Sequence, residues 1–360
     1  MSRLGLLALP VAATLLAAVP TDRPATACCP APPSGKPVVN TDQTVILLWD
    51  AANKTQHFIR KASFKSDADD FGFLIPSPSQ PELAESGNDA FPTLQKLTEP
   101  AVIQQKAPSG DGGCGCGYKM AAPAAGGVAT PDTVNVLDRK LVAGFNAAVL
   151  EATSADALTK WLKDNGYAYS PEIAVWAKPY IEQGWKVTAL KVAKGSDAKA
   201  DKTVAASALR LSFKTDRPLF PYREPDPSSA ATQLGATRRL LRIYFLADAR
   251  YRGELTKDVP WTGTVAWAGK LEAADREKVL GMLGLPATSG PAEWYLTEFE
   301  HLWPYEAAPA DVYFSPDPRQ MDARRQPIVQ YVSAASRPDG TAFLIVGALV
   351  LLPLVSRWRR

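Results

Sequence analysis

Residues 44–65 read TVILLWDAANKTQHFIRKASFK, and this stretch decides the fold class of the chain. The residues on both sides of DAANK (50–54) are rich in β-branched and aromatic types, which favour strands. DAANK itself supplies a polar turn, so the sequence predicts a β-hairpin here. A third strand is predicted at 70–75 (DFGFLI), and we expect it to end at Pro76 because proline donates no hydrogen bond to a sheet.

Outward from the hairpin, helices and further strands follow without a regular alternation. Apolar residues at helical spacing, together with capping residues, predict helices at 88–97, 154–165, 170–183 and 273–283. Runs rich in β-branched and aromatic residues predict strands at 134–150, 185–192, 206–213, 238–246 and 293–300, with short β pieces in 258–271. This order predicts the α+β class with a β-rich body.

A short internal sequence repeat indicates two related lobes. Residues 63–67 (SFKSD) and 212–216 (SFKTD) both end a predicted strand and lead toward a proline-containing turn. We therefore divide the body into a first β-rich lobe, 28–132, which carries a cysteine-containing loop, and a second α+β lobe, 133–302. Chance reuse of Ser, Lys and Asp at strand ends is the alternative explanation.

The N-terminal residues have the pattern of a secretion signal. Residues 4–19 are apolar and follow a basic residue, and Ala25-Thr26-Ala27 is the small-x-small pattern of signal-peptidase cleavage. We expect a signal peptide over residues 1–27 that is cut after Ala27. A lipoprotein signal, in which the mature chain begins with a lipidated Cys28, is the rival interpretation.

The C-terminal residues carry a second membrane signal. Residues 341–356 are a short, mostly apolar run, and the basic tail 357–360 follows it. The flanking arginines are Arg357, Arg359 and Arg360. Arginines beside a span favour the cytoplasmic side, so we expect a transmembrane helix that leaves the body outside, joined to it by a proline-rich stalk over 303–340. A sorting signal that is cut after export, or a buried core helix, are the alternatives for the tail.

The charge balance bears on the choice of partner. The chain holds 40 Lys and Arg against 37 Asp and Glu. Arg3, Arg23 and the three C-terminal arginines lie in the end segments, so the body is close to neutral. Such a body does not predict a nucleic-acid surface. The expected partners are the membrane, through the C-terminal helix, and an envelope protein or glycan.

Four cysteines fall into two clusters, Cys28-Cys29 and Cys114-x-Cys116. In the oxidising compartment that an export signal implies, such a small even number favours disulfides, and we expect pairing between the clusters. A zinc site of four thiolates is disfavoured because paired zinc ligands are usually separated by about two to four residues. A redox-active exposed pair is the third interpretation.

The sequence offers little catalytic chemistry. Its two histidines, His57 and His301, lie in predicted strands or at their edges, and no Gly-x-Ser-x-Gly elbow accompanies them. Glu298 and Glu300 share one strand face and could form a carboxylate pair for glycoside hydrolysis, although solubilising charge is the commoner role. We therefore assign no catalytic, cofactor-binding or metal-binding residue and expect no cofactor.

Several features stand in order along the body. They are the cysteines after the signal peptide, DDFGFLIPSP (69–78), WLKDNGY (161–167), PYIEQGW (179–185) and LRLSF (209–213). Together they resemble the bacterial domain-of-unknown-function 2330 family, over about residues 28–300. The resemblance implies an exported bacterial protein without an established activity, so it supplies no catalytic residues. The chain departs from the family pattern at Gly72, where we expect alanine, and at 75–78 (IPSP), where we expect Val-Pro-Val.

These features together predict a non-enzymatic protein of the cell envelope. Its body is displayed outside the cytoplasmic membrane, where it binds or scaffolds another envelope component. The alternatives are an extracytoplasmic hydrolase with an unrecognised site and a thiol- or metal-handling protein that uses the four cysteines.

Overall fold

A computed structural model describes residues 29–31, 38–40, 43–61, 63–66, 72–106, 133–167, 171–192, 203–205, 207–225, 239–256, 259–303 and 310–332. These residues belong to two compact units. Unit 1 comprises Met1–Pro100 and Ala122–Arg325, and unit 2 comprises Ala101–Ala121 and Gln326–Arg360. Strands outnumber helices among the described elements, which confirms the predicted β-rich α+β class.

Unit 1 is built around a seven-stranded sheet. Its strand order is β18-β19-β15-β3-β4-β13-β7, and β15 and β3 are its parallel neighbours. The bounds are β3 Gln43–Asp50, β4 Thr55–Lys61, β7 Glu82–Ser86, β13 Ala208–Lys214, β15 Arg239–Ala247, β18 Thr264–Lys270 and β19 Tyr295–Trp303. The predicted hairpin is therefore present as β3 and β4. Strand β3 is buried along nearly its whole length, as expected for an apolar run in a sheet that is covered on both faces.

A second sheet of five antiparallel strands packs on the first. Its order is β1-β6-β11-β10-β9. The bounds are β1 Cys29–Ala31, β6 Gly72–Ser77, β9 Val134–Val142, β10 Phe145–Ala152 and β11 Lys186–Val192. Alternate residues of both sheets meet in one core, such as Leu47 and Phe245 from the first and Phe73 and Val149 from the second. Both sheets combine strands from either side of residue 132, and the division into two lobes stays a prediction.

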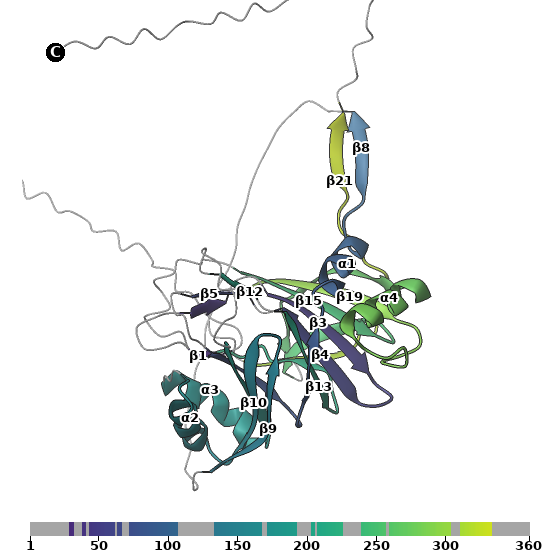
Figure 1. Ribbon diagram of the computed structural model, residues 1–360. Helices are drawn as coiled ribbons and strands as arrows, with labels where there is room; N and C mark the ends of the chain where they lie inside the picture. The colour runs from purple at the N-terminus through teal and green to yellow at the C-terminus, as the bar shows by residue number, and fades with distance from the viewer. Residues whose placement is uncertain are drawn as a thin grey trace, which may run out of the picture. The chain divides into compact units, whose positions relative to one another are not determined.

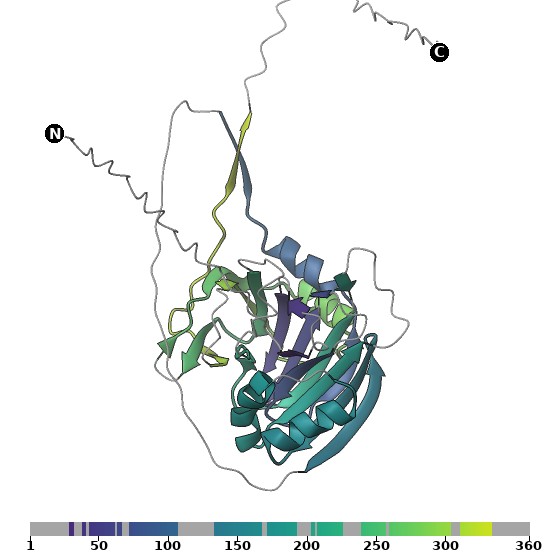
Figure 2. The same ribbon diagram turned by 90° about the vertical axis from the view of Figure 1, so that its left-hand side faces the viewer.

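Helices cover the outer face of each large sheet (Figures 1 and 2). Helices α1 (Ala90–Leu97) and α4 (Ala273–Leu283) share a hydrophobic cluster with the seven-stranded sheet. Helices α2 (Ala155–Asp164) and α3 (Pro171–Glu182) share another with the five-stranded sheet. The described part of unit 1 is therefore layered helix, sheet, sheet, helix, with a hydrophobic core between each pair of layers.

Smaller sheets complete the described part of unit 1. One has the order β14-β20-β16-β17, and the other has the order β12-β5-β2. The bounds are β2 Val38–Asn40, β5 Ser63–Ser66, β12 Thr203–Ala205, β14 Leu219–Phe220, β16 Tyr251–Thr256, β17 Val259–Pro260 and β20 Val312–Pro316. Residues 310–325 differ from the expected extended stalk, because Val312 and Phe314 of β20 are buried in the core between the large sheets.

Unit 2 holds a pair of parallel strands within its described residues. They are β8 (Val102–Lys106) and β21 (Ile328–Val332), and the amide of Ile328 donates to the carbonyl oxygen of Ala101 at 2.8 Å. In the described part of the chain, no helix is both long and apolar enough to cross a membrane. The predicted span at 341–356 lies outside the described residues.

The helices occupy their predicted positions. Helix α4 covers the predicted 273–283, and α2 begins after Ser154, whose hydroxyl accepts a hydrogen bond from the amide of Ala157 at 3.0 Å. Asp89 precedes α1 as predicted, but its side chain makes no capping hydrogen bond.

Some strand predictions are wrong in detail. Residues 134–150 are a hairpin rather than one strand, because Ala143 and Gly144 turn the chain with φ of 51° and 77°. Pro76 lies inside β6 rather than after it. Beyond Leu74, β6 pairs with β11 on one side and no longer with β1, and such an edge position tolerates a missing N–H.

Gly72 lies where the structure leaves no room for a side chain. A Cβ atom at Gly72 would lie 2.7 Å from the carbonyl oxygen of Leu190 and 2.7 Å from Cδ1 of Tyr167. Tyr167 is the last residue of the WLKDNGY motif. Alanine at position 72 would therefore require this tyrosine and the neighbouring strand to move.

Candidate functional site

A cavity of about 350 Å³ opens on unit 1 beside the C-terminal end of α3 and strand β20. We call it the α3 pocket. Its lining residues are Pro179, Tyr180, Gln183, Arg217, Arg223, Leu255, Ala310, Asp311 and Tyr313. The walls thus combine aromatic rings, two guanidinium groups and one carboxyl group, a mixture typical of a ligand site.

The PYIEQGW motif forms one wall of the α3 pocket. Helix α3 ends before Gly184, whose φ of 72° is a conformation that glycine adopts readily. The ring of Tyr180 packs against Trp185 at 5.2 Å between centroids, which fixes the tyrosine at the helix end. From the preceding turn, the indole of Trp176 donates to the carbonyl oxygen of Arg223 at 2.9 Å and holds the segment after β14 against α3.

Asp311 forms the floor of the pocket and is almost fully buried. Its Oδ1 accepts hydrogen bonds from the hydroxyl of Tyr180 at 2.8 Å and from the backbone amide of Arg223 at 3.0 Å. Burial outweighs these hydrogen bonds and raises the pKa of Asp311 above its ordinary value. A carboxyl group in this setting takes up a proton more readily than a solvated one does.

The two arginines of the pocket differ in their pairing. The Nη2 atom of Arg217 lies 2.6 Å from Oε2 of Glu254, and its guanidinium stacks over the ring of Tyr313 at 5.3 Å. Arg223 stacks over the ring of Tyr180 at 5.9 Å. Among the described residues, none forms an ion pair or hydrogen bond with the Arg223 guanidinium, and its Nε is buried. Within the described part of the chain, the side-chain donors of Arg223 are therefore left for a ligand.

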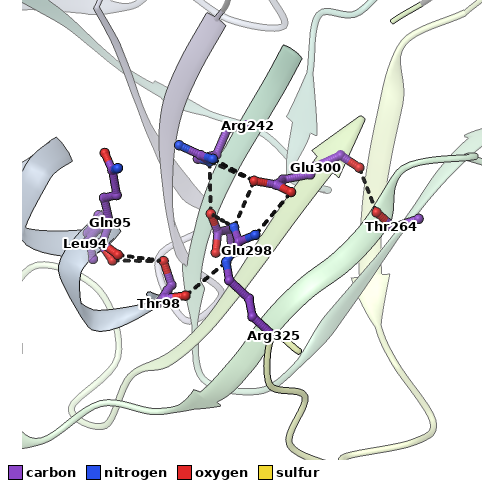
Figure 3. Close-up of polar contacts among 8 residues, drawn as sticks. All are labelled: Leu94, Gln95, Thr98, Arg242, Thr264, Glu298, Glu300 and Arg325. Atoms are coloured by element: carbon purple, nitrogen blue, oxygen red, sulfur yellow. Dashed lines mark hydrogen bonds and ion pairs between the residues drawn. The ribbon is translucent and has the colours of Figure 1, made fainter. Parts of the chain in front are cut away.

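Glu298 and Glu300, the carboxylate pair considered in the sequence, lie on β19 between two arginines (Figure 3). Arg242 lies 3.0 Å from Glu298 Oε1 and 2.7 Å from Glu300 Oε1. Arg325 reaches the same two oxygens at 2.6 and 2.8 Å. The Nε of Arg325 also donates to the carbonyl oxygen of Thr98 at 3.0 Å. We call these five residues the Arg–Glu cluster.

Each carboxylate of the Arg–Glu cluster contacts both guanidinium groups through Oε1, while Oε2 of Glu298 is buried without a hydrogen-bond partner among the described residues. The Glu298 side chain is almost completely buried, and burial raises its pKa despite the nearby arginines. Burial acts in the same direction on Glu300, but hydrogen bonds from Arg325 and Arg242 outweigh it and lower the pKa of Glu300. Both carboxylates are held by guanidinium groups, so the arrangement suits structural compensation of buried charge better than acid–base catalysis.

The two histidines each contact hydroxyl groups. His57 and Ser212 are opposite each other on β4 and β13, with 2.8 Å between Nδ1 and Oγ. Burial lowers the pKa of His57 to about 4, so its imidazole is neutral at pH 7 and is a weak base. His301 is buried, with Nδ1 at 3.2 Å from the Tyr222 hydroxyl and Nε2 at 3.0 Å from Thr262 Oγ1.

Several residues singled out in the sequence lie outside the described residues. They are Ala27, Cys28, Cys114, Cys116, Arg357, Arg359 and Arg360. Cys29 lies in β1. The expected disulfides, signal cleavage and membrane flank therefore stay predictions. Within the described ranges, no group of three or more His, Cys, Asp or Glu residues could hold a metal ion.

Arg223 and Asp311 of the α3 pocket carry no sequence signal that points to a site. Asp311 falls within the predicted stalk, and Arg223 follows β14 in a short proline-containing stretch. A partial signal was present in PYIEQGW, since Pro179, Tyr180 and Gln183 of this motif line the pocket. The motif marks one wall of the pocket. No local pattern in the sequence predicts that Arg223 or Asp311, which lie 40 or more positions away, would contact it.

Comparisons with known proteins give one clear match. A family model described as an uncharacterized protein conserved in bacteria (DUF2330) matches residues 23–314. No curated protein matches the chain. Among solved structures, the chain is similar to the crystal structure of baculovirus P35, with 9% sequence identity and a TM-score of 0.36 over 84% of this chain and 100% of that chain.

Proposed function

The chain belongs to the DUF2330 family of uncharacterised bacterial proteins, and we propose that it is an exported binding component of the bacterial cell envelope. In this proposal residues 1–27 are removed on export, and the apolar segment 341–356 anchors the body on the extracytoplasmic side. The apolar runs at both ends support this topology, as do the arginines after residue 356.

The α3 pocket is the observation that supports a binding role. Its wall includes residues of the PYIEQGW motif, and its floor is a buried carboxyl group. One of its guanidinium groups has no hydrogen-bond acceptor or ion-pair partner among the described residues. A concave site with few, convergent polar groups is the usual form of a small-ligand site. The body thus has the means to bind a small envelope molecule, such as a glycan unit, while the chain end holds it at the membrane.

Fractionation of cells that express the full-length chain tests the topology. We expect the protein in the membrane fraction, resistant to extraction with alkaline carbonate and shortened at its N-terminus by the mass of residues 1–27. Protease added to spheroplasts should digest the body. Full-length protein in the cytosol, with the N-terminal segment intact and the cysteines reduced, would contradict the proposal.

Crosslinking in native membranes tests the binding role. We expect the full-length chain to co-purify with an envelope protein or a glycan after crosslinking. The same preparation from a strain with Asp311→Ala and Arg223→Gln should recover less of that component, because both substitutions alter the α3 pocket. Recovery of no envelope component from the wild-type strain would argue against a binding role.

A hydrolase is the alternative that one specific observation favours, namely the 2.8 Å contact between His57 and Ser212. A serine nucleophile needs a base close to its hydroxyl, and this contact places an imidazole there, although the lowered pKa of His57 makes it a weak base. A fluorophosphonate probe applied to the full-length protein distinguishes the alternatives. Labelling that disappears in Ser212→Ala would support the hydrolase, and absence of labelling would support the binding role.

Thiol counting separates structural cysteines from a thiol- or metal-handling role. If the four cysteines form disulfides, the denatured exported protein should show no reactive thiol before reduction and four afterwards. Free thiols in the exported protein would favour the thiol-handling alternative.

A further inference from the structure

The Arg223 guanidinium lacks, among the described residues, the ion pair that the other pocket arginine has. The other pocket arginine, Arg217, is neutralised by Glu254, which also lies 3.0 Å from Arg252. Arg223 has the Tyr180 ring on one side, and its buried Nε has no acceptor among the described residues. A buried donor without an acceptor destabilises the folded chain, so an acceptor supplied by a ligand would be favourable.

The chemistry of this group selects the kind of ligand. A guanidinium presents its donors in a planar fork that matches two oxygens of a carboxylate or phosphate. The nearby carboxyl of Asp311 feels the charge of Arg223 but forms no ion pair with its guanidinium, and its Oδ1 accepts from the Tyr180 hydroxyl and from the Arg223 backbone amide. Burial also favours the protonated form of Asp311, which reduces its repulsion of an anion.

The pocket also limits the size of the ligand. Its volume of about 350 Å³ is near the lower end for small-molecule sites, which corresponds to a single sugar or a molecule of similar size. Tyr180 and Tyr313 supply ring surface to the lining, and Gln183 supplies an amide. Aromatic and amide groups beside an arginine suit a ring that carries both hydroxyl groups and an acidic group.

We propose that the α3 pocket binds the oxyanion of an acidic sugar, either a carboxylate or a phosphate monoester, with the Arg223 guanidinium as its principal contact. This inference rests on the proposed binding function and names its ligand class. Arg217 and the two tyrosines form the walls around the sugar ring, and Asp311 holds Tyr180 in place from below.

Calorimetric titration of the full-length protein in detergent tests the ligand class. The probes are a hexuronate, a hexose phosphate and the corresponding neutral hexose. We expect at least one acidic probe to bind roughly 10- to 100-fold more tightly than the neutral hexose, as a charge-assisted contact predicts. The tighter of the two acidic probes identifies the source of the oxyanion. Equal affinity for the neutral and both acidic sugars, or no binding of any probe, would overturn the proposal.

Variants locate the contact. Arg223→Gln should weaken binding of the acidic probe roughly 10- to 100-fold. Arg223→Lys should weaken binding less, because lysine keeps the charge but loses the planar guanidinium fork. Arg319→Gln is the matched control, since it removes an exposed arginine outside the pocket lining and should leave the affinity unchanged. Equal affinity in wild type and Arg223→Gln, with a native unfolding transition in both, would overturn the proposal. If the acidic sugars fail while an envelope component still co-purifies, the ligand class is wrong and the binding function stands.

Discussion

The Arg–Glu cluster and the α3 pocket both place arginines and carboxyl groups inside unit 1, but they pair them differently. In the cluster, Arg242 and Arg325 each contact both Glu298 and Glu300 within 3.0 Å. In the pocket, Asp311 is bound by a hydroxyl and a backbone amide, and the Arg223 side chain has no described acceptor. Removing one partner from a buried ion pair destabilises a fold, whereas a guanidinium without an acceptor leaves bonding capacity for a ligand.

The largest expected effect is in the Arg–Glu cluster. Arg242→Leu leaves two carboxylates to share Arg325, and the loss of one partner from a buried pair costs roughly 3 to 5 kcal/mol. Urea denaturation at pH 7 measures this change in the free energy of unfolding. The control is Arg319→Leu, whose side chain is 77% exposed and which should change stability by less than about 0.5 kcal/mol. Equal small losses in both variants would show that the cluster is not a structural element.

A smaller effect is expected at the floor of the pocket. Asp311→Ala leaves the Tyr180 hydroxyl and the Arg223 amide without their acceptor. Because water can enter the open pocket and replace part of this bonding, we expect a total cost of roughly 1 to 3 kcal/mol. Asp311→Asn keeps an acceptor oxygen and removes the buried charge, so its stability at pH 7 should lie close to that of wild type. Denaturation of both variants measures the difference. A loss in Asp311→Asn as large as in Asp311→Ala would mean that the charge itself stabilises the pocket.

The dependence of stability on pH should have opposite signs at Asp311 and at Glu300, whereas Glu298, whose pKa is raised by burial, acts in the same direction as Asp311. The raised pKa of Asp311 means that its contribution is present below its ordinary pKa of 3.8 and is lost as pH rises through the pKa in the folded state. The lowered pKa of Glu300 means that its contribution is present above 4.5 and is lost as pH falls through the pKa in the folded state.

Stability measured from pH 3 to 7 in wild type, Asp311→Asn and Glu300→Gln tests these signs. As the pH falls, the free energy of unfolding of wild type should rise relative to that of Asp311→Asn. Over the same pH range, the free energy of unfolding of wild type should fall relative to that of Glu300→Gln. If both differences changed in the same direction with pH, the predicted contrast between Asp311 and Glu300 would be wrong.

The smallest expected effect on stability is at Arg223. Arg223→Leu removes no ion pair or side-chain hydrogen bond with a described residue, and leucine retains apolar contact with the Tyr180 ring. We expect a change within about 0.5 kcal/mol in urea denaturation. A loss comparable with that of Arg242→Leu would indicate that Arg223 is a structural residue.

Local sequence signals predicted the elements well, as two cases illustrate. The predicted helix 273–283 is α4, and Ser154 caps α2, because spacing and capping act within a few residues. The missed turn at Ala143 also has a local cause, since a positive φ of 51° in a residue other than glycine has no compositional sign.

The candidate site was harder to predict because it is assembled from distant residues. Asp311 contacts Tyr180, which lies 131 positions earlier, and Trp176 contacts Arg223 across 47 positions. Such contacts follow from the packing of layers rather than from any local pattern. Glu298 and Glu300 show the same limit, since the sequence placed them on one strand face but gave no sign of Arg242 and Arg325.

One experiment tests the central claim that the Arg–Glu cluster supports the fold and the α3 pocket binds the ligand. Arg242→Leu and Arg223→Leu are each assayed for urea stability and for affinity toward the tighter acidic sugar probe, under conditions in which both are folded. We predict that Arg242→Leu loses stability and retains affinity, and that Arg223→Leu loses roughly 10-fold or more in affinity and retains stability. If each variant lost both stability and affinity, or if neither variant lost either property, the central claim would be contradicted.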